Sequence, residues 1–130
     1  MARKPLERVF CVEDDDDIRR ILRLALERIG GMTVELVAEP ADAITRMVEF
    51  APDLVMLDWM LPGIDGPTLL KEMRRTPALA SVPVVFATAK ASPREMAELS
   101  ALGAAGVISK PFAPKELPAK LRAIWERLGS

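Results

Sequence analysis

The sequence alternates five times between a short apolar run and a longer stretch whose apolar residues recur at helical spacing. At least three of the short runs have no polar break, which is typical of strands buried on both faces of a parallel sheet. Each right-handed helical crossover returns the chain to the same end of such a sheet. We therefore predict an α/β fold with a five-stranded parallel sheet, doubly wound as (βα)5. The predicted strands are Arg8–Val12, Thr33–Val37 at an edge, Leu54–Leu57, Pro83–Ala87 and Gly106–Ser109.

The helical stretches carry recognisable start and stop signals. From Ile18 to Ile29 the apolar residues fall on one face and the arginines on the other, and Gly30-Gly31 ends this helix. Another helix begins with a Ser cap at Ser92, Pro93 at the first helical position and Glu95 at the capping-box position. The other predicted helices run from Pro40 to Ala51-Pro52, from Pro67 to about Arg75, and from Leu117 to Leu128.

The length of the chain predicts one domain. With 130 residues, half of them hydrophobic, residues 1–130 are enough for one core, at about residues 8–128, and we expect no output domain. The charged start of the sequence leads us to expect no signal peptide, and no apolar run is long enough to cross a bilayer. We therefore expect a cytoplasmic protein without membrane insertion.

Composition limits the chemistry further. With no His and a single Cys, zinc sites and Ser-His or Cys-His catalysis are excluded. Any chemistry of this chain must therefore use carboxylates, hydroxyls and lysines. Cys11 lies in an apolar run and is expected to be a small buried hydrophobe. The net charge of -1 and the absence of a basic stripe with aromatic residues predict no direct binding to nucleic acid.

Polar side chains follow four of the predicted strands, at the edge where ligands bind in open sheets of this kind. Three carboxylates and one ammonium give a formal charge of about -2, which is unfavourable unless a hard dication neutralises it. Mg²⁺ prefers such oxygen ligands and readily accepts a phosphate oxygen as well. Taken alone, Asp58 could begin a turn or cap a helix, and Asp15 to Asp17 are expected to do so at a helix N-terminus. The polar residues at this edge are Glu13, Asp14, Asp58, Thr88 and Lys110.

Four motifs at these strand ends resemble those of one family. An acidic pair follows the first strand, and Leu-Asp-x-Met-Leu-Pro-Gly-Ile-Asp-Gly surrounds Asp58. Ala-Thr-Ala-Lys spans residues 87–90, and Lys-Pro-Phe spans residues 110–112. From about Arg8 to Leu128 the chain resembles a response-regulator receiver domain of two-component signalling, of the single-domain, stand-alone type. The resemblance implies the flavodoxin-like strand order 2-1-3-4-5.

The resemblance also implies a role for each polar residue. Asp58 would be the phosphoacceptor, attacking the phosphorus of a phosphohistidine on a sensor histidine kinase or a histidine phosphotransfer protein. Lys110 would pair with Asp58 and then with a phosphoryl oxygen, the Thr88 hydroxyl would donate to another, and the small Ala89 would leave the in-line approach open. The Mg²⁺ cofactor would be held by Asp14 and Asp58 directly, by Glu13 through water, and by the backbone carbonyl of Met60.

The expected protein is a switch that phosphorylates and dephosphorylates itself and changes its binding surface for a downstream target protein. It is not expected to be a turnover enzyme for an external substrate. Receivers commonly have a cis peptide before the conserved proline, so we expect cis geometry at Lys110–Pro111.

Three residues depart from the family pattern. Glu13 stands where Asp is commoner, which lengthens one arm of the metal site and keeps its charge. Val107 stands at the switch position, where the family usually has Tyr or Phe. Pro118 lies early in the last helix, where its ring is expected to crowd the preceding turn. The departures at Val107 and Pro118 are expected to affect how the signal is passed on, and not the phosphorylation chemistry.

Alternatives remain open. A receiver-like module could bind partner proteins without being phosphorylated, and acetyl phosphate or beryllofluoride with Mg²⁺ would discriminate, because an inert module would ignore both. A flavin carrier is disfavoured because acidic residues stand where a phosphate loop should follow the first strand. A phosphatase using an aspartyl phosphate would need a second carboxylate close after Asp58, where Met60 stands instead.

Overall fold

The five predicted strands form one parallel sheet. The structure is a computed structural model, and it describes residues 4–89 and 92–129. The strand order is β2-β1-β3-β4-β5, so the predicted order and the edge position of the second strand are confirmed. The strands are β1 (Arg8–Val12), β2 (Thr33–Val37), β3 (Leu54–Asp58), β4 (Val84–Thr88) and β5 (Gly106–Ser109).

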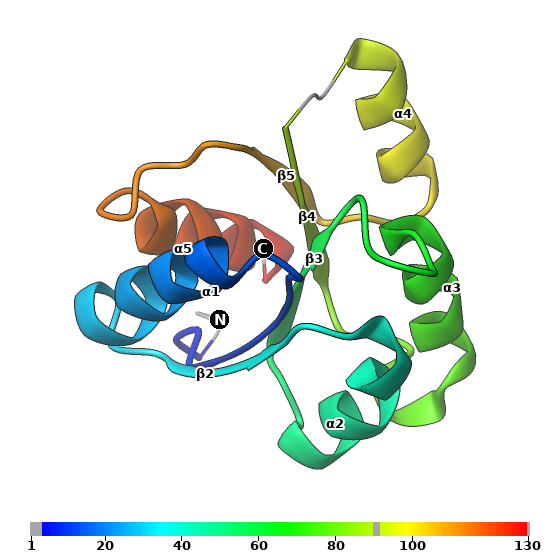
Figure 1. Cartoon of the computed structure of the whole chain (residues 1–130), viewed down its shortest axis with the longest axis horizontal. Coiled ribbons are helices and arrows are strands. Elements are labelled where there is room, and N and C mark those ends of the chain that lie inside the picture. Colours follow the sequence, from blue (N-terminus) through cyan, green and yellow to red (C-terminus); the bar gives the residue numbers. More distant parts are fainter. Residues whose placement is uncertain (1–3, 90–91, 130) are drawn as a thin grey trace.

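The helices form two layers, one on each face of the sheet (Figure 1). One layer contains α1 and α5, and the other contains α2, α3 and α4. Because side chains alternate across the strands, the core is divided into two clusters, one under each layer. The helices are α1 (Asp16–Arg23) with a π-helical continuation η1 (Leu24–Ile29), the 3₁₀ turns η2 (Pro40–Asp42) and η3 (Pro77–Leu79), α2 (Ala43–Phe50), α3 (Gly66–Arg75), α4 (Pro93–Ala101) and α5 (Leu117–Leu128).

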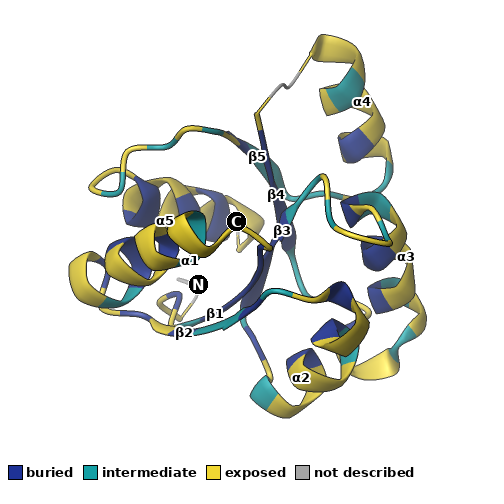
Figure 2. Ribbon diagram, viewed as in Figure 1, coloured by how far each residue is buried: buried dark blue, intermediate teal, exposed yellow. Residues whose placement is uncertain are grey.

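Burial differs strongly among the elements (Figure 2). All five residues of β4 are buried, whereas the edge strand β2 has only two buried residues. Helix α5 buries five side chains and α4 buries only Leu99. Cys11 is fully buried, and burial raises the pKa of its thiol, so the prediction of a buried hydrophobe is confirmed. No helix within the described residues is both long and apolar enough to cross a membrane.

The first helix begins two residues earlier than Ile18. Asp15 is its N-cap and accepts a hydrogen bond from the Ile18 amide at 3.0 Å, which confirms the capping role expected for this acidic run. The last turn widens into η1, where the Gly30 amide donates to the Ala25 carbonyl at 2.9 Å. Apolar spacing alone does not predict this, because one widened turn shifts the periodicity only slightly. Gly31 then takes a positive φ of 69° and ends the segment.

Pro118 stands at a position where helices commonly tolerate proline. It lies in the first turn of α5, after the N-cap Glu116, where a backbone donor has no partner within the helix in any case. A Cβ at Gly30 would lie only 3.1 Å from the Pro118 ring, so the small glycine allows the end of η1 to pack on α5. The Arg122 side chain also donates to the Gly30 carbonyl. Pro118 therefore joins two helices of the same layer.

Candidate acidic site at the carboxyl edge of the sheet

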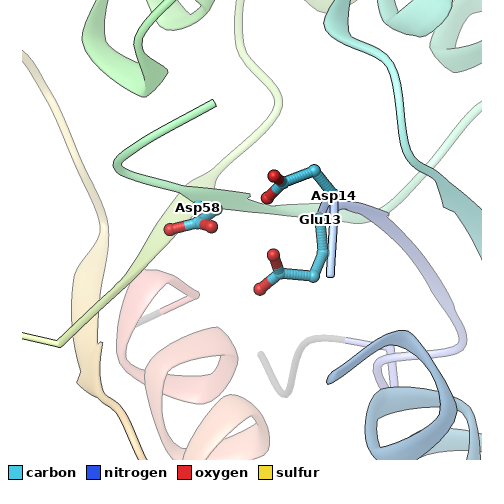
Figure 3. A group of neighbouring side chains, drawn as sticks. All are labelled: Glu13, Asp14 and Asp58. Atoms are coloured by element: carbon cyan, nitrogen blue, oxygen red, sulfur yellow. The ribbon is translucent and has the colours of Figure 1, made fainter. Parts of the chain in front are cut away.

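Three carboxylates meet where β1 and β3 end (Figure 3). One oxygen atom from each of Glu13, Asp14 and Asp58 lies within 4.8 Å of the others. The register explains this, because Val12 pairs with Leu57 and the residue after each therefore lies at the same edge. We call these three residues the acidic trio. Glu13 is only 3% exposed, Asp58 is half-buried and Asp14 is exposed.

Lys110 binds two members of the acidic trio at once. Its Nζ lies 2.6 Å from Glu13 Oε1 and 3.1 Å from Asp58 Oδ2. The Lys110 amide also donates to the Thr88 carbonyl at 2.8 Å, which extends the pairing of β5 with β4 and fixes where the side chain starts. The Lys110–Pro111 bond is cis, the geometry expected from the resemblance. The longer side chain of Glu13 thus competes with Asp58 for the same ammonium.

The pKa values at the site depend on burial and on the contacts of Lys110 with both Glu13 and Asp58. Burial raises the pKa of Glu13, and the adjacent Asp58 raises it further against the opposing effect of Lys110, to about 7. Burial also lowers the pKa of Lys110, but the hydrogen bonds and charges of Glu13 and Asp58 outweigh it, and the net shift is upward. Lys110 is therefore held as a cation between two carboxyl groups that compete for it.

An open pocket of ≈ 630 Å³ adjoins the acidic trio, and we call it the edge pocket. Met60 is 71% exposed at this pocket, and Thr88 is buried. The Met60 amide lies 3.4 Å from Asp58 Oδ1, the long end of the hydrogen-bonding range. The edge pocket is lined by Asp58, Trp59, Met60, Thr88, Ala89, Glu95 and Lys110.

The structure brings together most of the residues singled out in the sequence. Glu13, Asp14, Asp58 and Lys110 form the acidic cluster, and Met60, Thr88 and Ala89 line the adjoining edge pocket. Val107 is not among them. It packs against the core under α2, α3 and α4, and it lines a separate groove of ≈ 750 Å³ between β5 and α5 that contains none of the acidic trio.

Sequence reasoning missed the place of Glu95. It was assigned to a capping box, and the structure forms one half of that box: the Glu95 amide donates to Ser92 Oγ at 3.1 Å. Glu95 also lines the edge pocket. The capping-box spacing places Glu95 in the first turn of α4, but the contact with the edge pocket depends on how α4 packs, which local sequence does not specify.

The residues present fit a hard divalent cation. Three carboxylates with only one ammonium among them leave an excess of negative charge, and Asp14 and Asp58 have oxygen atoms open to solvent or to the edge pocket. Oxygen-only ligand sets of this kind suit Mg²⁺, which retains several waters.

The fold and site together define a class: a doubly wound α/β protein with an acidic cluster and a lysine at the carboxyl edge of a five-stranded sheet. The model of the response regulator receiver domain matches residues 9–122. The chain therefore belongs to the response-regulator receiver domain family, whose members generally bind Mg²⁺ at an acidic pocket.

Similar proteins agree with this family. The chain is 38% identical over 122 residues to the phosphate regulon transcriptional regulatory protein PhoB of Escherichia coli, covering 93% of this chain and 52% of that protein. It thus spans about half the length of the curated relatives it matches. Among solved structures, the chemotaxis response regulator CheY4 of Vibrio cholerae has a TM-score of 0.84 at 27% identity, covering 92% of this chain and 98% of that one. A putative response regulator from Chloroflexus aurantiacus has a TM-score of 0.82 at 33% identity, covering 94% and 98%.

Proposed function

We propose that this receiver domain accepts a phosphoryl group on Asp58 and thereby changes its binding surface. The observation that carries the proposal is the position of the Asp58 carboxylate, which ends a buried strand, contacts Lys110 at 3.1 Å and faces the edge pocket. Such a carboxylate is held in place by the sheet and is open to a ligand on one side. The acidic cluster around it supports a site for Mg²⁺, which would neutralise charge during transfer.

The reaction is a substitution at phosphorus. An oxygen of Asp58 forms a bond to phosphorus while the bond from phosphorus to a histidine nitrogen of the donor breaks, and the imidazole leaves with that electron pair. Lys110, which contacts Asp58, would neutralise a phosphoryl oxygen once it releases that carboxylate, and the Thr88 hydroxyl would donate to another. The cation would be held directly by Asp14 and Asp58, by the backbone carbonyl of Met60, and through water by Glu13. Ala89 keeps the approach open.

We further propose that the donor is a sensor histidine kinase or a histidine phosphotransfer protein, and that the phosphorylated form binds a target protein in the cytoplasm. An apolar pocket of ≈ 310 Å³ shares Ala89 and Lys110 with the edge pocket and is also lined by Ile18, Ile21, Pro111 and Phe112. A protein donor seated there would have its phosphohistidine within reach of Asp58. The domain would act as a switch and not as a turnover enzyme.

Incubation with acetyl phosphate tests the proposal. We expect the intact protein to gain the mass of one phosphoryl group when Mg²⁺ is present and none when EDTA removes it. A chain that takes up no phosphoryl group from acetyl phosphate, and that does not bind beryllofluoride, would instead be an interaction module.

Trp59 should report the metal. Its indole follows Asp58 directly, is half-buried and lies 6.2 Å from the Phe86 ring between centroids. Trp125 is buried in α5, in the opposite layer, where its Nε1 donates to the Lys4 carbonyl at 2.7 Å. We expect Mg²⁺ to change the tryptophan emission of the native protein and of Trp125→Phe, but not of Trp59→Phe. If Mg²⁺ changed the emission of Trp59→Phe as much as that of the native protein, the metal would lie elsewhere.

The side chain of Val107 leads to a prediction about how phosphorylation changes the binding surface. It has no ring to turn inward, and its β-branched side chain is stiff at χ1. We therefore expect phosphorylation to be transmitted mainly through residues 88–91 and the start of α4, of which Lys90 and Ala91 lie outside the described residues. Structures with and without beryllofluoride and Mg²⁺ would check this: the loop should move while Val107 keeps its rotamer. A large movement of β5 would contradict the prediction, and no movement at all would mean that the domain barely switches.

A further inference from the structure

The edge pocket contains one acidic side chain that the proposed chemistry does not use. Glu95 lies in the first turn of α4 and lines the edge pocket together with Asp58 and Lys110. The hydrogen bond from its amide to Ser92 Oγ fixes it at the third position of the helix. A small molecule bound at Asp58 in the edge pocket would therefore occupy a pocket that an acidic residue of α4 also lines.

The charge of Glu95 is not compensated locally. Among the residues that the structure describes, no lysine or arginine forms an ion pair with its carboxylate. Glu98, one turn further along the same helix, is paired with Arg94 at 3.7 Å. Lys110 supplies positive charge to the edge pocket, but Glu13 and Asp58 already hold it. The edge pocket thus keeps one negative charge, that of Glu95, which a dication held by the acidic trio would not pair with directly.

We propose that Glu95 is a specificity-determining residue that disfavours small, doubly charged phosphodonors at Asp58. This rests on the proposed phosphoacceptor function. A fixed charge beside a pocket lowers the local concentration of ions of the same sign and slows their entry. A protein donor gains contacts outside the edge pocket, so one repulsive charge matters less to its reaction than to that of a free dianion.

Two small donors of different charge test the inference. At neutral pH acetyl phosphate is a dianion and phosphoramidate a monoanion, and both transfer a phosphoryl group without a protein partner. At low salt and saturating Mg²⁺, judged by the Trp59 emission, we expect Glu95→Gln to accelerate phosphorylation by acetyl phosphate roughly two- to fivefold. The gain should be smaller with phosphoramidate and should vanish at high salt. Glu95→Asp, which keeps the charge, should react like the native protein.

Glu98→Gln is the matched control. It removes the same charge from the same helix at a residue that does not line the edge pocket, and we expect no acceleration. Equal rates for Glu95→Gln and the native protein, equal gains in both variants, or a gain that persists at high salt would each overturn the role of Glu95. If neither donor phosphorylates the native protein, the phosphoacceptor function itself fails and the inference falls with it.

Discussion

The Asp58→Asn variant is expected to take up no phosphoryl group from acetyl phosphate or from a phosphohistidine donor. The amide keeps the shape of the side chain but lacks the nucleophilic oxygen, and Asp58 is the member of the acidic trio that lines the edge pocket together with Thr88 and Ala89. Intact-mass measurement after treatment with the donor gives the result directly. The fold should persist, with a free energy of unfolding unchanged or raised by up to about 1 kcal/mol, because one of the competing negative charges is removed.

Asp42→Asn is the matched control, because Asp42 is an exposed aspartate that neither belongs to the acidic trio nor lines the edge pocket. It should be phosphorylated like the native protein. Uptake of a phosphoryl group by Asp58→Asn equal to that of the control would show that another side chain is the acceptor.

Stability should depend on pH through Glu13. Its pKa rises from an ordinary value of 4.5 to about 7 in the folded protein, so between these values the folded state holds a proton that the unfolded state has lost. The free energy of unfolding must then fall as the pH rises through this range, by on the order of 2 to 3 kcal/mol. Urea unfolding at about pH 5 and about pH 8, without divalent cations, measures the loss.

Glu13→Gln should remove most of this loss, because the amide does not titrate. Glu49→Gln, at an exposed position on α2, should leave it unchanged. Asp58→Asn should also reduce it, since the charge of Asp58 is one cause of the raised pKa of Glu13. A pH dependence that is the same in Glu13→Gln and in the native protein would contradict the proposed cause.

The strand ends were predictable from the sequence because apolar runs and turn residues are local signals. Once the parallel sheet is inferred, Glu13, Asp58 and Lys110 must lie at one edge, and the structure places them there. What could not be predicted depends on side-chain reach and on helix packing. Glu13 reaches the Lys110 ammonium that Asp58 also contacts because Glu is one methylene group longer than Asp. The position of Glu95 at the edge pocket depends on how α4 packs on the sheet.

Helix α4 is held on the sheet by few buried side chains, which makes it the helix that we expect to move most easily. Its one fully buried side chain, Leu99, accounts for about 2 kcal/mol of hydrophobic free energy. Helix α5, with five buried side chains, should be harder to displace. We therefore expect a few kcal/mol of binding free energy at the edge pocket to displace α4 before they displace α1 or α5.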